Sequence, residues 1–261
     1  MVLVCGGCER GFLHDVPLLR EPNDTECNPL NIPKKFHGSA ALTDMFLGWE
    51  ADAGAEAFRL ERKIGGAWVE IATVGSATLA YTDSEAVELD SRATYRLIAT
   101  SGRCESAATE PLGLFSFPKA PTALSATALS SSSIKLSWTD PNVLESNYQV
   151  RREVEGEAPE ELPLLATNTE TLTDTGLQSG VAYRYRLRAL SQARDPSPET
   201  TATQWTIPLP PTELRTRAAS ETSIELLWQH PNPEAVSYRI ERRLLDTGGP
   251  FVDIGQSEAG A

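Results

Sequence analysis

The fold is decided by four alternating runs of apolar and polar residues: Ile134-Lys-Leu-Ser-Trp138, Tyr148-Gln-Val-Arg-Arg152, Thr171-Leu-Thr-Asp174 and Tyr183-Arg-Tyr-Arg-Leu-Arg-Ala189. Successive side chains of a β-strand point to opposite faces, so this alternation indicates strands with one buried and one solvent-facing side. The stretch from Ile134 to Ala189 therefore predicts a β-domain.

Aromatic landmarks recur along the chain at a nearly constant spacing. Trp49, Trp138 and Trp228 are 89 and 90 positions apart, and Phe58, Tyr148 and Tyr238 are 90 positions apart at both steps. A period shared by several landmarks indicates tandem repeats. The predicted units are an irregular, cysteine-containing N-terminal segment (1–32), repeat 1 (33–117), repeat 2 (119–207) and repeat 3 (209–261).

The ends of these units carry further information. The proline-bearing linkers 115–121 and 207–211 predict semi-rigid spacers and an elongated string of repeats. In repeat 1 the pattern places Phe46 and Trp49 in the core.

The positions one period after Thr173 and Tyr183 lie beyond Ala261, so the last three strands of repeat 3 are expected to be missing. We therefore expect a truncated third repeat and a fragment of a longer protein.

A tryptophan on an early strand, with a leucine six positions before a tyrosine that leads a later strand, resembles the fibronectin type III module. The residues that carry the resemblance are Trp49, Trp138, Trp228, Leu177 and Tyr183. It implies an all-β chain of tandem immunoglobulin-like sandwiches, with Tyr183 as a tyrosine corner whose hydroxyl binds nearby backbone. Repeat 1 has Ala93 at that position, so we expect it to be less stable than repeat 2.

The resemblance also implies a class of function. Residues 131–140 are similar to the repeats of bacterial surface proteins and of secreted polysaccharide-degrading enzymes, where such modules separate other domains. This implies a non-catalytic spacer and interaction module of a larger extracellular or surface protein, whose partners are other domains of the same polypeptide. The alternative is an adhesin or receptor-like ectodomain that binds a protein or polysaccharide through repeat 2.

Composition limits the partners. The 261 residues carry a net charge of −13 with a pI near 4.8, which argues against binding to nucleic acid because the field repels phosphate. No apolar run reaches the length of a membrane span, so no membrane insertion is expected. The N-terminus lacks the pattern of a signal peptide, so either export depends on sequence upstream or the chain is not exported.

Four cysteines leave two readings open. Cys5, Cys8 and Cys27 together with His37 would supply enough ligands for a structural zinc ion, although the second half of the ligand spacing is loose. The other reading is disulfides. In the family that the chain resembles, the loop that carries Cys104 lies at the pole where the N-terminal strand enters. The resemblance therefore implies that Cys104 can meet an N-terminal cysteine. Of the three pairings that four cysteines allow, we favour Cys27 with Cys104 and Cys5 with Cys8.

One surface feature distinguishes repeat 2. If Tyr183, Tyr185 and Leu187 point inward, the arginines between them point outward. The candidate binding face consists of Arg151, Arg184, Arg186 and Arg188. A basic stripe on an acidic protein suits an acidic protein segment or an anionic glycan. The alternative is that nearby glutamates, either Glu160 and Glu161 or Glu153 and Glu155, neutralise the stripe in exposed ion pairs.

The sequence contains no recognised catalytic motif. It has no nucleophile elbow, phosphate loop, dinucleotide fingerprint or zinc-protease helix. Its three histidines, His14, His37 and His230, are scattered. We therefore expect neither catalysis nor a cofactor.

Overall fold

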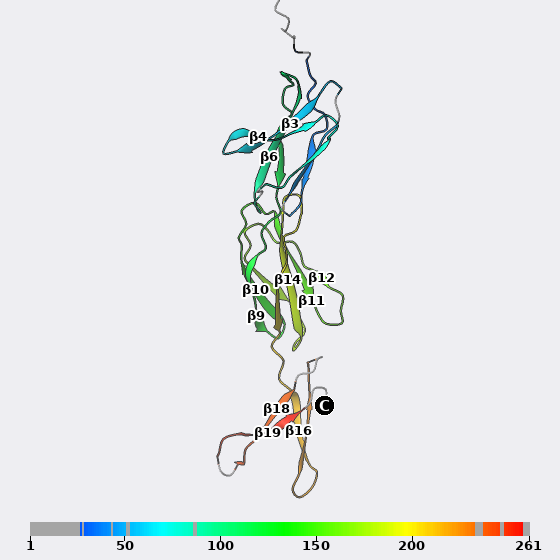
Figure 1. Cartoon of the computed structure of the whole chain (residues 1–261). Helices are drawn as coiled ribbons and strands as arrows, with labels where there is room; N and C mark the ends of the chain where they lie inside the picture. Colours follow the sequence, from blue (N-terminus) through cyan, green and yellow to red (C-terminus); the bar gives the residue numbers. More distant parts are fainter. Residues whose placement is uncertain are drawn as a thin grey trace, which may run out of the picture.

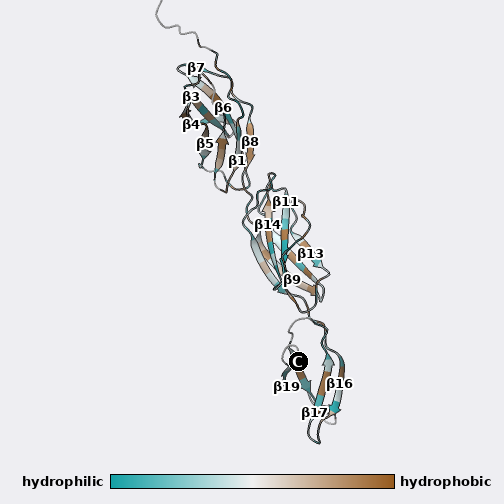
Figure 2. Ribbon diagram, turned by 90° about the vertical axis from the view of Figure 1, so that its right-hand side faces the viewer, coloured by the Kyte–Doolittle hydropathy of each residue, from teal (hydrophilic) through white to brown (hydrophobic). Residues whose placement is uncertain are grey.

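The computed structural model describes residues 27, 29–42, 44–50, 53–85, 88–232, 237–245 and 248–257. In this part of the chain the named secondary-structure elements are all β-strands, and they form three successive groups (Figure 1). The units follow one another along one long axis, and the strands show alternating hydrophilic and hydrophobic bands (Figure 2). The three groups of strands fall within residues 33–117, 119–207 and 209–261.

Repeat 2 is a sandwich of two antiparallel sheets. One sheet has the order β13 (Thr171–Thr175), β10 (Ser133–Thr139), β9 (Thr122–Ser130). The other has the order β12 (Glu160–Glu161), β11 (Asn147–Glu153), β14 (Ala182–Leu190), β15 (Thr200–Trp205). The inward side chains of both sheets form one buried core, which includes Ile134, Leu136, Trp138, Tyr148, Val150, Tyr185 and Leu187.

Repeat 1 repeats this arrangement. Its first sheet has the order β1 (His37–Ala40), β2 (Met45–Gly48), β5 (Ala80–Asp83). Its second sheet has the order β4 (Ala67–Gly75), β3 (Ala57–Ile64), β6 (Arg92–Ser101), β7 (Cys104–Glu105), and β8 (Leu112–Phe115) also pairs with β6. A two-glycine turn, Gly65-Gly66 with positive φ at both residues, closes the β3–β4 hairpin.

One core assignment in repeat 1 was wrong by one position. Met45 and Leu47 are buried, and Trp49 directly after β2 is buried too, whereas Phe46 is 45% exposed. Phe46 and Trp49 are an odd number of positions apart, so they cannot share a face of one regular strand. The alternation counted from Trp49 gives the observed core.

In the described residues of repeat 3, the strands form two separate pairs. The first pair is β16 (Thr212–Ala218) with β17 (Ile224–Gln229), and the second is β18 (Tyr238–Arg242) with β19 (Val252–Ser257). The recurring aromatic contact is present in all three repeats, with ring centroids 5.7 Å apart for Trp49–Phe58, 5.8 Å for Trp138–Tyr148 and 6.0 Å for Trp228–Tyr238. This contact explains why the two aromatic series keep the same period.

Candidate functional site

The predicted arginine face forms on the four-stranded sheet of repeat 2. On β14 the residues Tyr183, Tyr185, Leu187 and Ala189 are buried, which turns the arginines between them to the opposite side. Strand β11 lies beside β14, and its register places Arg151 opposite Arg186 and Glu153 opposite Arg184. Arg151, Arg184, Arg186 and Arg188 therefore share one face across two neighbouring strands.

Two glutamates neutralise much of this face. Arg186 donates from Nε to Glu153 Oε1 at 2.6 Å and from Nη1 to Glu199 Oε2 at 3.3 Å. Arg151 lies 3.4 Å from the carboxylate of Glu153, and Arg188 lies 3.9 Å from that of Glu199. The hydrogen bond from Arg186 lowers the pKa of the Glu153 carboxyl. The face is thus a network of partly exposed ion pairs.

The neutralising partners differ in part from those expected. Glu153 was predicted, but Glu160 instead contacts Arg152, which lies on the inward side of β11. Glu199 is an additional partner, which directly precedes β15 on the side of β14 opposite β11. Partly exposed pairs of this kind contribute about 0–1 kcal/mol each. The face therefore offers less free positive charge than four arginines suggest.

A second group of charged residues is buried between the two sheets of repeat 2. Arg152 donates from Nη1 to both carboxylate oxygens of Asp174, at 2.9 and 3.0 Å. The hydroxyl of Tyr185 donates to Asp174 Oδ2 at 2.9 Å. Asp174 is 7% exposed, so its charge is compensated by an arginine and a tyrosine rather than by water. This group is called the buried triad of repeat 2.

Repeat 1 contains the same triad. Arg62 Nη1 donates to Asp83 Oδ2 at 2.6 Å, and the hydroxyl of Tyr95 donates to the same oxygen at 2.9 Å. The arginines and the tyrosines of the two triads are each 90 positions apart, and the aspartates 91. In the sequence analysis these residues received no joint role. The sequence signal for the triad is a charged residue, Arg62 or Arg152, at a position where the alternation of the strand predicts an inward side chain.

The tyrosines of the core give a pH prediction. Burial, followed by the nearby carboxylates, raises the pKa of Tyr95, Tyr148 and Tyr185 well above the ordinary value of about 10. Above that pH the unfolded chain releases these protons while the native chain keeps them. The unfolded state then binds fewer protons, so stability falls as the pH rises beyond about 10.

Spectroscopic titration of the tyrosinate absorbance checks this prediction. The signal of these three residues should appear only as the native amide resonances of repeats 1 and 2 disappear. Tyrosinate absorbance equivalent to more than three of the six tyrosines, in a chain whose amide resonances are unchanged, would contradict it.

The tyrosine corner is also present. The hydroxyl of Tyr183 accepts a hydrogen bond from the backbone N–H of Gln178 at 2.8 Å. Leu177, directly before it, is 7% exposed and packs in the core. Both residues therefore have the structural roles that the resemblance implied.

Comparison with known families agrees with this geometry. Residues 119–203 match the family model described as the fibronectin type III domain. Repeat 2 is a fibronectin type III domain. A two-domain fibronectin type III segment of chicken tenascin is 19% identical, with a TM-score of 0.43 over 67% of this chain and 100% of that chain. The FN1–FN3 domains of chicken CNTN1 are 18% identical, with a TM-score of 0.40 over 70% of this chain and 69% of that chain.

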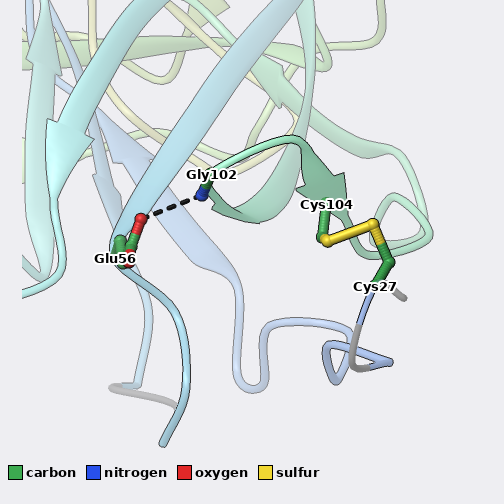
Figure 3. The surroundings of a disulfide bond; sticks show 4 residues. All are labelled: Cys27, Glu56, Gly102 and Cys104. Atoms are coloured by element: carbon green, nitrogen blue, oxygen red, sulfur yellow. Dashed lines mark hydrogen bonds between the residues drawn. A yellow bond between two sulfur atoms is a disulfide. The ribbon is translucent and has the colours of Figure 1, made fainter. Parts of the chain in front are cut away.

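A disulfide ties the N-terminal segment to repeat 1. Cys27 and Cys104 are bonded, with Cα atoms 5.3 Å apart and a sequence separation of 77 (Figure 3). Cys104 begins β7, and the turn before it is held by the N–H of Gly102, which donates to Glu56 Oε2 at 2.9 Å. Leu30, a little further along, packs against the core of repeat 1. The last residues of the N-terminal segment therefore belong structurally to repeat 1.

The zinc hypothesis does not fit this arrangement. The sulfur of Cys27 is used in the disulfide, so it is not a thiolate ligand. The ring Nδ1 of His37 lies 2.7 Å from the carbonyl oxygen of Lys35. Cys5 and Cys8 lie outside the described residues, and within the described ones no three metal-binding side chains come together.

The described part of the chain also has no helix long and apolar enough to cross a membrane.

Proposed function

We propose that this chain is a non-catalytic spacer and interaction module of a multidomain extracellular or surface protein. Its repeats would set the distance and the direction between other domains of the same polypeptide. A spacer that sets direction needs joints that resist bending. The observation that carries the proposal is the joint between repeats 1 and 2, which side-chain hydrogen bonds hold in one geometry.

Asp90 is the central residue of this joint. It lies before β6 in repeat 1, and its carboxylate accepts hydrogen bonds from the backbone N–H groups of Val143 at 2.7 Å and Leu144 at 2.9 Å, both in repeat 2. Its own N–H donates to the carbonyl oxygen of Phe117 in the linker at 2.8 Å. Asp90 has φ of 58°, a left-handed conformation that aspartate tolerates better than most residues. Repeat 1, the linker and repeat 2 thus meet at one residue, through its carboxylate and its backbone N–H.

The joint continues into repeat 2 through Asn142. Its side chain accepts from the N–H of Lys119 at 2.7 Å and donates to the carbonyl of the same residue at 3.0 Å. Asn232 makes the same pair of bonds with Leu209 in repeat 3, at 2.8 and 3.0 Å. Each domain therefore fastens the linker that precedes it, but this contact alone does not join it to the previous domain.

The second joint has no carboxylate at the position that corresponds to Asp90. Gly180 stands one period after Asp90, with a similar φ of 67°, and offers no side chain. Pro233 stands one period after Val143, and proline has no N–H to donate. We therefore expect the joint between repeats 1 and 2 to be stiffer than the joint between repeats 2 and 3.

The substitution Asp90→Gly tests the proposal in the full chain. Glycine keeps the left-handed backbone and the N–H that binds Phe117, so only the carboxylate is lost. Each lost hydrogen bond contributes about 0.5–1.5 kcal/mol, so amide exchange at Val143 and Leu144 should rise about 2- to 10-fold. The residual dipolar couplings of repeats 1 and 2 should no longer fit a single orientation.

Glu110→Gln is the matched control, because it removes an exposed carboxylate from repeat 1 at a position away from the joint. It should leave both measurements unchanged. If Asp90→Gly also leaves the two repeats in one fixed orientation, Asp90 does not set the direction of the joint and the proposed role loses its main support.

The disulfide supports the extracellular part of the proposal. Structural disulfides persist in oxidising compartments and are rare in the reducing cytosol. The bond between Cys27 and Cys104 fits a chain that works outside the cell.

A further inference from the structure

The disulfide changes the path that a pulling force takes through repeat 1. Cys27 precedes β1, and Cys104 begins β7, so the bond closes a covalent loop over the residues between them (Figure 3). Strands β1 to β6 lie inside this loop, and β7 and β8 continue from it towards repeat 2. A load that enters from the N-terminal side therefore passes from Cys27 to Cys104 through the two sulfurs and bypasses β1 to β6.

The segment of repeat 1 that does carry the load is already extended. It runs antiparallel beside β6, from Cys104 at the start of β7 to Phe115 at the end of β8. Between β7 and β8 the N–H groups of Ser106 and Thr109 donate to carbonyl oxygens of β6, each at 2.9 Å. Strand β6 is about 30 Å long, and the eleven positions from Cys104 to Phe115 can reach about 40 Å at most. Stretching this segment therefore gains only about 10 Å.

Repeat 2 has no such bypass. It contains no cysteine, and its first and last strands, β9 and β15, are linked covalently only by the polypeptide between them. A load has to pass through all of its strands, so unfolding can release the full length of residues 119–207. The chain thus combines one repeat that is shielded from tension with one that is not.

We propose that the Cys27–Cys104 disulfide makes repeat 1 an inextensible unit under tension and that reduction of the bond makes the repeat extensible. The proposal rests on the spacer function and deepens it, because a spacer sets a distance only while its length is fixed under load. The bond closes a sequence separation of 77, which corresponds to about 250–280 Å of stretched chain. Reduction adds this length to what the chain can reach.

The reduction consists of two thiol–disulfide exchanges. Cys27 is the exposed end of the bond, and Cys104 is partly buried. One thiolate of a dithiol reductant attacks the sulfur of Cys27, and Cys104 leaves as a thiolate that takes up a proton. The second thiolate of the reductant then attacks the mixed disulfide and releases Cys27 in the same way. The reductant becomes a disulfide, and its two electrons reduce the two cysteines.

Single-molecule stretching of the full chain by its two ends tests the change in length. The double variant Cys27→Ser/Cys104→Ser should release about 250–280 Å more than the unmodified oxidised chain. Dithiothreitol should lengthen the unmodified chain by the same amount. The total length does not depend on the stability of repeat 1, so the comparison holds even if the double variant folds poorly. An oxidised chain that releases the full length overturns the proposal.

Thiol labelling under load tests whether repeat 1 stays folded behind the bond. Ala99 and Ala189 are equivalent positions, 90 residues apart, and both are 0% exposed. Each is replaced singly, as Ala99→Cys or Ala189→Cys, in an oxidised chain that also carries Cys5→Ser and Cys8→Ser. At a load that unfolds repeat 2, a fluorescent maleimide should label the Ala189→Cys chain and leave the Ala99→Cys chain unlabelled.

Removal of the bond provides the matched control. With Cys27→Ser and Cys104→Ser added, the Ala99→Cys chain should be labelled at the same load. Labelling of that chain with the bond intact, or no labelling without the bond, overturns the proposal. Asp90→Gly keeps the disulfide and should leave the released length unchanged. A fixed orientation of repeats 1 and 2 in that variant would contradict the directing role of Asp90 alone, whereas labelling of a bonded repeat 1 would contradict only the shielding.

Discussion

Asp174→Ala is expected to lower the free energy of unfolding of repeat 2 by about 3 kcal/mol. Breaking a buried ion pair by removing one partner costs about 3–5 kcal/mol, because it leaves the other charge buried without compensation. Here the substitution leaves both Arg152 and the hydroxyl of Tyr185 without their acceptor. We take the lower end of the range, because the side chain of Arg152 is 19% exposed and keeps its contact with Glu160.

Urea titration followed by the amide resonances of each repeat checks this value in the full chain. Repeat 2 should unfold at lower urea than in the unmodified chain, and repeat 1 should not change. Asp174→Asn should cost less than Asp174→Ala, because the amide oxygen still accepts a hydrogen bond while the charge is lost.

Arg186→Ala is the matched control on the same sheet. It removes an arginine with ion pairs of similar length on the solvent side, so it should cost only about 0.2–1 kcal/mol. Equal losses for Asp174→Ala and Arg186→Ala would mean that the triad is no better shielded from water than the arginine face.

The arginine face and the arginine of the buried triad show what the sequence could predict and what it could not. The alternation of β14 fixes which side of the sheet each residue faces, so the arginine face followed from the sequence. The partners did not follow, because Glu199 directly precedes β15, whose position beside β14 is a property of the sheet order. A period of 2 gives the face of a residue and says nothing of its neighbours on the next strand.

The joint between repeats 1 and 2 shows the same limit. The proline-bearing linker predicted a semi-rigid spacer, yet the residue that holds the joint is Asp90, which lies 53 positions before Val143. Only the folded arrangement brings these two loops together. The repeat period offers one indication of a special backbone at this site, because a glycine, Gly180, stands at the matching position of repeat 2. Both residues have a left-handed backbone.

Removal of the Cys27–Cys104 disulfide is expected to cost repeat 1 about 4 kcal/mol. In the chain-entropy model the bond restricts the unfolded state, and the effect grows with the size of the closed loop, from about 3 kcal/mol for 15 residues to about 4.7 for 100. The sequence separation of 77 places this bond near the upper end. Repeat 1 also lacks the tyrosine corner, since Ala93 stands where repeat 2 has Tyr183. We therefore expect the reduced repeat 1 to be the less stable of the two.

The double variant Cys27→Ser/Cys104→Ser isolates this bond, because Cys5 and Cys8 are unchanged. Urea titration of the repeat 1 resonances should show the loss, and a reducing agent should bring the unmodified chain to the same midpoint. Repeat 2 contains no cysteine and should not respond. A change below about 1 kcal/mol in repeat 1 would show that closing this loop does not stabilise the domain. A loss of the expected size would be a large part of the roughly 5–15 kcal/mol that stabilises a typical domain. Repeat 1 would then depend on an oxidising compartment to stay folded.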